Sequence, residues 1–162
     1  MDPELVALAQ TVLAQNRAAG RRVAVAESCT GGMVAAALTE IAGSSDVFDR
    51  GFVTYSNEAK MEMLGVSEDV IGTFGAVSVA AAWAMAQGAL RHSLADVAVS
   101  ITGIAGPGGA TQSKPVGMVV FARAVRGQDP ETVVADTRQF GDLGRAEVRR
   151  QAALMALTLL LP

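Results

Sequence analysis

Two largely apolar runs, each followed at once by a glycine-rich segment, constrain the fold of this chain most. Arg22–Glu27 leads directly into Ser28-Cys29-Thr30-Gly31-Gly32, and Asp96–Ile101 leads into a longer loop over Thr102–Pro115. Short apolar runs bounded by turn residues are typical of buried strands. We expect both loops to open on one edge of a sheet, at the carboxyl ends of its strands, where ligands bind in open α/β folds.

The rest of the chain alternates predicted helices with further strands. Apolar residues at helical spacing, with cap and stop residues at the ends, predict helices. These cover Pro3–Ala18, Met33–Ile41, Asn57–Leu64, an Ala-rich segment that Ser78 caps and that runs to about Ser93, and Gly144–Leu160, with a short turn or helical piece at Ser67–Ile71. The further predicted strands are Val47–Tyr55, Val116–Val125 and Thr132–Gln139. The pattern indicates an α/β fold of three layers, in which helices cover a mixed, mostly parallel sheet, and a single domain over residues 1–162.

Composition and charge exclude several classes of function. The formal net charge is -3 and no basic block is present, so nucleic acid is not an expected partner. A small anionic ligand needs only one or two well-placed cations. The single cysteine cannot form an internal disulfide, and the amino terminus lacks the basic region of a signal peptide. The most apolar stretch, Gln151–Pro162, is too short to span a bilayer, so we expect a cytoplasmic protein without a membrane partner.

The first glycine-rich loop joins the end of a strand to the start of a helix. Helix amino termini carry unpaired N–H groups that stabilise phosphates, carboxylates and developing oxyanions. Gly31 and Gly32 allow a ligand to approach the backbone closely, and Ser28 and Thr30 offer hydroxyl groups. In the alternative interpretation Ser28 or Thr30 only caps the helix, which we would favour for an isolated junction of this kind. The segment matches neither a phosphate-binding P-loop, nor a dinucleotide fingerprint, nor a nucleophile elbow.

Cys29 is a second candidate nucleophile, because a helix dipole lowers the pKa of a thiol. The chain has one histidine, His92, near the end of the Ala-rich helix, and we interpret it as a structural or surface residue. Without a histidine base, a Cys–His or Ser–His–Asp mechanism is disfavoured. Because no cluster of His and Cys residues exists, a zinc site is not expected. We also expect no cofactor.

A lysine is the base that remains available to a serine in this chain. Tyr55 lies at the end of a predicted strand and Lys60 in the first turn of the next helix, so both can point toward the Ser28 loop. The reference pKa of lysine is about 10.4, so burial or a neighbouring cation must lower it. The Tyr55 hydroxyl can hold a serine–lysine hydrogen bond in line. From its spacing alone, Lys60 is more simply interpreted as a solvated helix residue.

The second glycine-rich loop is long for a compact domain, and such loops are usually functional. Its four glycines, Gly103, Gly106, Gly108 and Gly109, offer backbone N–H groups, and Lys114 offers a positive charge. The alternative is a flexible surface hairpin. We favour a functional loop, because it follows a buried strand just as the first loop does.

Taken in order, these motifs resemble those of the CinA carboxy-terminal domain family over nearly the whole chain. They are Ala26-Glu27-Ser28-Cys29-Thr30-Gly31-Gly32, Tyr55-Ser56-Asn57 with Lys60, Gly75-Ala76-Val77-Ser78, Thr102-Gly103-Ile104-Ala105-Gly106-Pro107-Gly108-Gly109 and Lys114-Pro115-Val116-Gly117. Each motif is weak alone, and the ordered set is highly specific. Where family members often carry Gly-Asp-Arg before the last helix, this chain has Gly141-Asp142-Leu143-Gly144-Arg145, which displaces the aspartate.

The resemblance implies an α/β fold, metal-free hydrolysis and usually a homodimer. The family includes stand-alone amidases that act on nicotinamide nucleotides. Ser28 matches the family's nucleophile, and Lys60 and Tyr55 match its supporting catalytic residues. Thr102 and the glycine-rich loop match ligand-binding positions, and Arg145 resembles the family's late arginine.

We therefore expect a metal-independent amidase that hydrolyses the carboxamide of nicotinamide mononucleotide, with Lys60 as the base for Ser28. N–H groups near Thr30 and Gly31, or near Gly103, are candidate oxyanion donors. Candidate phosphate anchors are Arg145, Lys114 and a glycine-rich loop, and candidate ring contacts are Phe52, Val77 and Ile104.

The rival interpretation is a non-catalytic nucleotide-binding or interaction module. In that case Ser28, Thr102 and the glycines bind phosphate and Lys60 is a surface charge. A dinucleotide-dependent oxidoreductase is disfavoured by the missing fingerprint.

Overall fold

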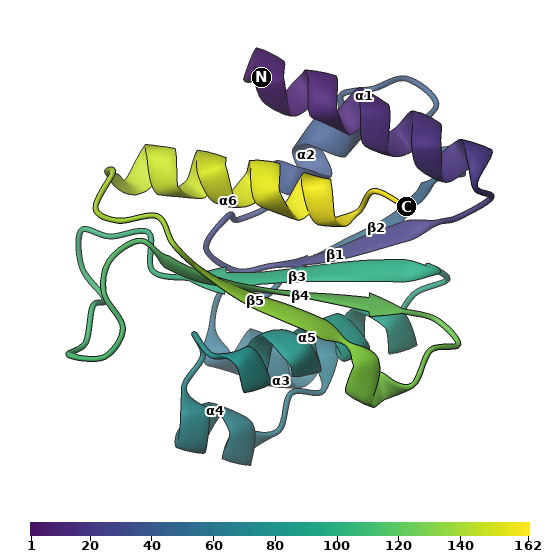
Figure 1. Cartoon of the computed structure of the whole chain (residues 1–162). Helices are drawn as coiled ribbons and strands as arrows, with labels where there is room; N and C mark the ends of the chain where they lie inside the picture. Colours follow the sequence, from purple (N-terminus) through teal and green to yellow (C-terminus); the bar gives the residue numbers. More distant parts are fainter.

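The computed structural model describes residues 1–162 as a five-stranded sheet between two layers of helices (Figure 1). The strands are β1 (Val23–Glu27), β2 (Phe48–Val53), β3 (Val97–Gly103), β4 (Met118–Val125) and β5 (Val134–Gln139). The helices are α1 (Pro3–Ala18), α2 (Met33–Thr39), α3 (Asn57–Leu64), α4 (Glu68–Phe74), α5 (Val79–Arg91) and α6 (Arg145–Leu159), with 3₁₀ turns at Ser44–Asp46 and Pro130–Thr132. Helices α1, α2 and α6 cover one face of the sheet, and α3, α4 and α5 lie on the other (Figure 1). None of the helices combines the length and the apolar character needed to cross a bilayer.

The sheet is mixed in equal parts, which corrects the expectation of a mostly parallel sheet. Its strand order is β2-β1-β3-β4-β5; the β1–β2 and β1–β3 pairs are parallel, and the β3–β4 and β4–β5 pairs are antiparallel. The connections explain the difference, because a parallel pair needs a crossover segment, usually a helix. Helices follow β1 and β2, whereas β3, β4 and β5 are joined by segments that contain no α-helix.

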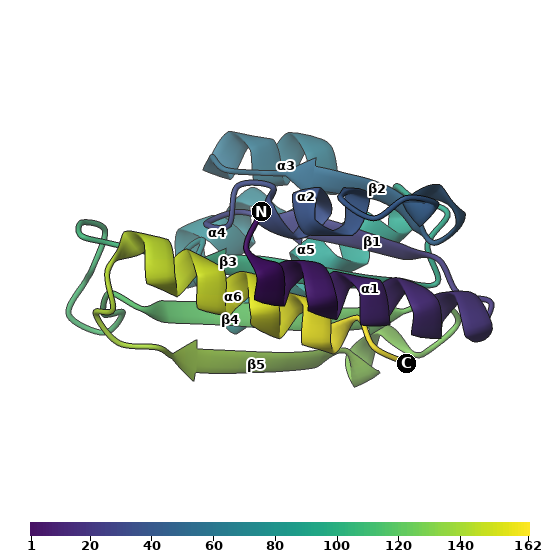
Figure 2. The same cartoon turned by 90° about the horizontal axis from the view of Figure 1, so that it is seen from above.

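Small side chains let the helices approach the sheet closely. Ala24, Ala26 and Ala98 of the central strands belong to the core beneath α5, which is itself rich in alanine. Helices α5 and α3 also pack closely at Gly88 of α5, where an added Cβ would lie 2.1 Å from the carbonyl oxygen of Leu64 on α3. Any larger residue at this position would push α3 away. On the opposite face α1 and α6 run side by side (Figure 2), and Asn16 Nδ2 donates to Leu160 O at 2.9 Å.

Serine caps set the start of three helices. Ser56, Ser67 and Ser78 each accept a hydrogen bond from the backbone N–H three residues later, at 3.0, 3.2 and 3.1 Å. The cap predicted at Ser78 is thus present, and the short piece predicted at Ser67–Ile71 is a helix that extends to Phe74. The second helix ends at Thr39 and the second strand at Val53, each two residues before the predicted end.

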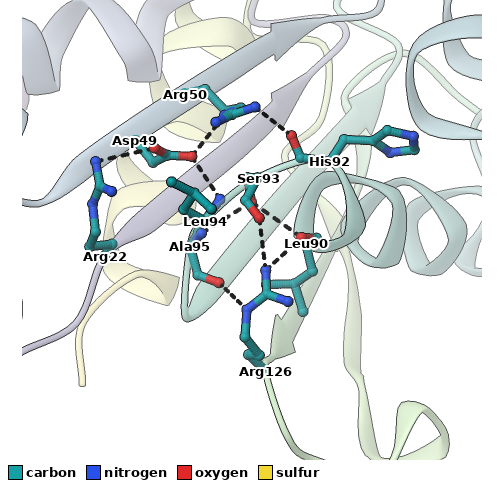
Figure 3. A network of polar contacts seen from close by, with 9 residues as sticks. All are labelled: Arg22, Asp49, Arg50, Leu90, His92, Ser93, Leu94, Ala95 and Arg126. Carbon is teal, nitrogen blue, oxygen red and sulfur yellow. Dashed lines mark hydrogen bonds and ion pairs between the residues drawn. The ribbon is translucent and has the colours of Figure 1, made fainter.

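The amino ends of β1 and β3 are tied together by a polar network (Figure 3). Asp49 pairs with Arg22 at 3.1 Å and with Arg50 at 2.7 Å, and accepts a hydrogen bond from the N–H of Leu94. Arg126, just after β4, donates to the carbonyl oxygens of the three residues Leu90, Ser93 and Ala95. These contacts fix the segment between α5 and β3 at the end of the sheet away from the two glycine-rich loops.

Candidate active site

A cavity of about 250 Å³ lies at the carboxyl ends of β1 and β3, where the two glycine-rich loops meet. Its lining comes from five segments: Ser28 and Cys29, then Tyr55, Asn57 and Lys60, then Ala76 and Val77, then Thr102–Gly106 with Gly108 and Gly109, and finally Arg145. Figure 1 shows the loop after β3 and the start of α6 at this same end of the sheet. Its volume lies just below the range of about 300–1,000 Å³ that is usual for small-molecule sites.

Lys60 is buried in the wall of this cavity and points at Ser28. The residue is 1% exposed, and its Nζ donates to Ser28 Oγ at 3.0 Å, to Thr54 O at 2.9 Å and to Tyr55 O at 3.3 Å. Because α3 begins directly after the end of β2, a side chain in its first turn is directed back toward the strand end. The interpretation of Lys60 as a solvated residue is therefore wrong.

Burial shifts the amine of Lys60 toward its neutral form. Burial lowers the pKa of Lys60 from the ordinary value of 10.5, and no carboxylate forms an ion pair with it. A neutral amine within hydrogen-bond distance of a serine hydroxyl can accept its proton. The geometry therefore allows Lys60 to act as a base toward Ser28.

Tyr55 is placed differently from its predicted role. The residue is 60% exposed, and its hydroxyl accepts a hydrogen bond from Arg145 Nη2 at 2.9 Å. Only its main-chain carbonyl contacts Lys60. The hydroxyl thus does not hold the Ser28–Lys60 hydrogen bond in line in this structure. Its contact with Arg145 instead places both side chains at the mouth of the cavity.

The amino end of α2, after the first loop, is capped by Glu27, which was not among the predicted site residues. Glu27 accepts hydrogen bonds from the N–H groups of Val34 and Ala35, both at 3.0 Å, so neither loop hydroxyl caps α2 through its own oxygen. Thr30 is fully buried and donates from its hydroxyl to Glu27. Thr30, Gly31 and Gly32 do not line the cavity, although they were predicted to bind substrate.

The second loop contributes backbone to the cavity. Thr102, Gly103, Gly106 and Gly108 all line it, while Lys114 lies outside and donates from Nζ to Phe74 O at 2.5 Å. The Thr102 hydroxyl donates to Ala76 O at 2.7 Å. The N–H groups of Ala105, Gly106, Gly108 and Gly109 donate to no acceptor of the chain. An added Cβ at Gly106, where φ is 83°, would lie 2.6 Å from Val116, so this position requires glycine.

Arg145 reaches the cavity despite the displaced aspartate before it. As the first residue of α6 it donates from Nη1 to Gly106 O at 2.9 Å and from Nη2 to the Tyr55 hydroxyl. Arg145 and the buried amine of Lys60 are the basic side chains of the lining, and no carboxylate belongs to it. Because a guanidinium stays protonated, Arg145 makes the cavity a positive region suited to an anion in a chain of net charge -3.

Cys29 and His92 do not form a second catalytic pair. Burial raises the pKa of the Cys29 thiol to about 11, so the thiolate is disfavoured. His92 lies at the other end of the sheet, where its Nδ1 contacts Gly88 O at 2.8 Å (Figure 3). No three His, Cys, Asp or Glu side chains come close enough together to hold a metal ion.

Residues 5–162 match the family model of the CinA C-terminal domain. The chain belongs to this family. Its resemblance to the CinA family, drawn from the motifs alone, is therefore confirmed.

Similar CinA family proteins are found both alone and in longer chains. The nicotinamide-nucleotide amidohydrolase PncC of Escherichia coli K12 is 52% identical over 157 residues, which cover 96% of this chain and 92% of that protein. A competence-damage inducible protein of Caldicellulosiruptor saccharolyticus is 60% identical over 107 residues, but the match spans 26% of its length. The crystal structure of CihA from Agrobacterium tumefaciens superposes with a TM-score of 0.93 at 48% identity, covering 99% of this chain and 95% of that one.

Sequence reasoning overlooked three residues of this CinA site. Glu27 belongs to the first CinA motif, but nothing in the sequence indicates that its carboxylate caps α2. Arg149 donates to Cys29 O at 3.1 Å and to Thr30 O at 3.3 Å, and its spacing of four from Arg145 on one helix face was the signal available. Asn57 lines the cavity without a side-chain hydrogen bond to the chain. Of the predicted ring contacts, Val77 and Ile104 line the cavity and Phe52 does not.

Proposed function

We propose that this chain is a nicotinamide-nucleotide amidase that converts nicotinamide mononucleotide and water into nicotinic acid mononucleotide and ammonia. The observation that carries the proposal is the 3.0 Å hydrogen bond between buried Lys60 and Ser28 in the wall of a positive cavity. The similarity to PncC over 96% of the chain supports this substrate.

Lys60 and Ser28 perform the bond changes. Neutral Lys60 takes the proton of Ser28 as Oγ attacks the carboxamide carbon, which forms a C–O bond and places the displaced electron pair on the carbonyl oxygen. Collapse of this oxyanion breaks the C–N bond, and Lys60 returns the proton to the leaving nitrogen, so ammonia departs and an ester on Ser28 remains. Lys60 then takes a proton from water, whose oxygen attacks the ester carbon; the bond to Oγ breaks, Lys60 gives the proton to Oγ, and the acid formed is released and loses its own proton to solvent. Each half-reaction leaves Lys60 neutral once its proton has passed on.

The N–H group of Cys29 is the proposed oxyanion donor. Ser28 itself donates its N–H to Ile101 O at 2.9 Å and is not available. The N–H of Cys29, which directly follows the nucleophile and lines the cavity, donates to no acceptor of the chain. Removing one such donor from a hydrolase typically costs about 10²–10³-fold in kcat.

Arg145 and the second loop form the proposed phosphate site. The guanidinium of Arg145 contacts only neutral oxygens and lines the cavity beside the unpaired N–H groups of Gly106, Gly108 and Gly109. Guanidinium and backbone N–H groups together are a common phosphate-binding combination. This assignment replaces Lys114, whose amine is engaged with Phe74 O outside the cavity.

The nicotinamide ring fits the apolar wall between these two sites. Val77 and Ile104 are apolar side chains that line the same cavity as Ser28 and Arg145. The ring of the nucleotide is a pyridinium cation, and its charge favours a neutral Lys60, because two like charges in one site repel.

The assembly, domain and location assignments stay predictions. We infer a homodimer from the family resemblance and a cytoplasmic location from the composition. We also infer that residues 1–162 form one domain, because every strand belongs to one sheet. Light scattering on the purified protein tests the dimer.

Ammonia release from nicotinamide mononucleotide tests the function directly. The purified protein, treated with a chelator, is compared with Ser28→Ala and with the control Ser44→Ala on the remote 3₁₀ turn. We expect release by the wild type and the control and none by Ser28→Ala. Turnover by Ser28→Ala would contradict the assignment of Ser28 as the nucleophile. Nucleotide binding without ammonia release by any form would favour the non-catalytic module.

A further inference from the structure

Glu27, the last residue of β1, forms hydrogen bonds that hold the turn containing the proposed nucleophile Ser28. The residue is 1% exposed and immediately precedes Ser28. Its carboxylate accepts three hydrogen bonds, from Thr30 Oγ1 at 2.7 Å and from the N–H groups of Val34 and Ala35 at 3.0 Å each. The first N–H groups of α2 are thereby satisfied within the chain, so they are not available to a substrate anion.

Arg149 of α6 holds the carbonyl groups of the same turn. It donates to Cys29 O at 3.1 Å and to Thr30 O at 3.3 Å, while Ser28 O accepts from the N–H of Gly31 at 3.0 Å. In a planar trans peptide the carbonyl of one residue and the N–H of the next point in opposite directions. Fixing the carbonyls of Ser28 and Cys29 therefore also fixes the directions of the N–H groups of Cys29 and Thr30.

The two N–H groups fixed in this way are left without partners. Neither Cys29 N nor Thr30 N donates to an acceptor of the chain, although Thr30 is fully buried. Buried N–H groups without a partner are rare in folded proteins, and where they occur they call for an explanation. Here they lie one and two residues after the nucleophile.

We propose that Glu27 and Arg149 are positioning residues for the reaction at Ser28, which rests on the proposed amidase chemistry. Both lie outside the cavity lining and act through the turn between them. By taking up the other donors and acceptors of the turn, they keep the N–H group of Cys29, which lines the cavity, directed and free for the developing oxyanion. Such preorganised donors stabilise the transition state without having to reorient during the reaction.

Conservative variants test this role. Glu27→Gln keeps size and shape but exchanges one acceptor oxygen for an NH₂ group, so at least one of the three donors loses its partner. Arg149→Lys keeps the charge but cannot bond two carbonyls with a planar fork. The matched controls are Glu40→Gln at the other end of α2 and Arg150→Lys, whose guanidinium pairs with Asp2 and Glu4.

Two rates are measured, because one of them does not depend on the nucleotide. The first is labelling of Ser28 by a fluorophosphonate, in which Oγ forms a bond to phosphorus, fluoride leaves and the serine proton passes to Lys60. The second is kcat and KM for nicotinamide mononucleotide. We expect labelling and kcat to fall about 10–100-fold in both variants, since one donor is worth about 10²–10³-fold when lost completely. KM should stay within about threefold, and both controls should match the wild type.

The outcomes separate this proposal from the proposed function. Labelling and kcat within about threefold of wild type in the folded variants overturn the positioning role. So does a lower melting temperature with an unchanged kcat per folded molecule, because a merely structural role gives that result. Normal labelling of the wild type without ammonia release contradicts the nucleotide amidase alone, and the labelling rates then still decide the roles of Glu27 and Arg149. A wild type inert to both compounds overturns both proposals. If Glu27→Gln does not fold, Arg149→Lys carries the same comparison.

Discussion

The two ends of the sheet both carry cationic side chains and use them in different ways. At the amino ends of β1 and β3, Arg22 and Arg50 both pair with Asp49, and Arg126 donates to three carbonyl oxygens (Figure 3). This end connects the strands with α5. The structure has two cavities besides the one at Ser28, and this end lines none of the three except at the edge of α5.

At the carboxyl ends the cations have no carboxylate partners. Lys60 contacts a hydroxyl and two carbonyls, and Arg145 contacts a carbonyl and a phenol. Burying a lysine in this way costs stability, because the charged form loses its hydration. The difference teaches that composition alone does not locate function: the arginines at one end connect strands and loops, and the basic side chains at the other end line a cavity.

Replacing Lys60 should give the largest contrast between the two ends. For Lys60→Met we expect kcat to fall by about 10²–10⁴-fold, the usual contribution of a general base. The unfolding free energy should change little, because an apolar chain of similar length replaces a buried amine. Arg126→Met is the matched change at the other end and should leave kcat unaltered. An equal loss of kcat in Lys60→Met and Arg126→Met, measured by ammonia release, would contradict the proposed functional difference between the two ends of the sheet.

The pH dependence of the reaction sharpens the same contrast. Burial lowers the pKa of Lys60 below 10.5, and only the neutral amine accepts the proton of Ser28. The rate should therefore rise with pH and level off above the pKa of Lys60, losing about tenfold per pH unit well below it. Single-turnover rates between pH 5 and pH 10 report this profile. A rate that falls as pH rises would contradict Lys60 as the base.

Replacing Arg145 separates binding from chemistry within the cavity end. Hydrogen bonds to charged groups contribute about 1.5–3 kcal/mol, so Arg145→Met should raise KM for nicotinamide mononucleotide about 10–100-fold with a smaller effect on kcat. Nicotinamide riboside, which lacks the phosphate, should be hydrolysed equally by both proteins. An equal loss with the two substrates would place Arg145 in a role other than phosphate binding.

The smallest effect on catalysis is expected at Asp49. Burial alone would favour its neutral form, but the N–H of Leu94 and the guanidinium groups of Arg50 and Arg22 outweigh burial and lower the pKa of Asp49 below 3.8. Its stabilisation is thus present above pH 3.8 and is lost as the pH falls toward the lowered value. Asp49→Asn should lose about 1.5–3 kcal/mol of unfolding free energy at pH 7, with unchanged kcat.

Denaturant unfolding at pH 7 and pH 3 checks this expectation. The difference in unfolding free energy between wild type and Asp49→Asn should be smaller at pH 3 than at pH 7. A difference that stays constant with pH would mean that the charge of Asp49 contributes nothing to the stability of the network.

The features that depend on neighbours in sequence were predictable. The serine caps of α3 and α5, the two buried strands with their glycine-rich loops and the shared edge all follow from local patterns. The sheet was predicted less well, because the loop between β3 and β4 does not reveal that the chain returns antiparallel.

The features that depend on tertiary contacts were not predictable. Spacing alone does not show whether Lys60 faces solvent or the core, since that depends on where α3 packs. Glu27 caps a helix that begins six residues after it, and Tyr55 turns its hydroxyl to an arginine 90 residues later in the chain. Both contacts require the loop and α6 to be in place.

The position of α6 has a consequence for how the protein is made. Ser28 and Lys60 are synthesised early, whereas Arg145 and Arg149 lie in the last helix, which also covers one face of the sheet with Val148, Ala152 and Leu157. A growing chain that still lacks α6 has Ser28 and Lys60 but neither the proposed phosphate anchor nor the contacts that fix the turn after Ser28. Activity is therefore expected to appear only after α6 has been synthesised, and loss of α6 to a premature stop or to proteolysis should abolish it.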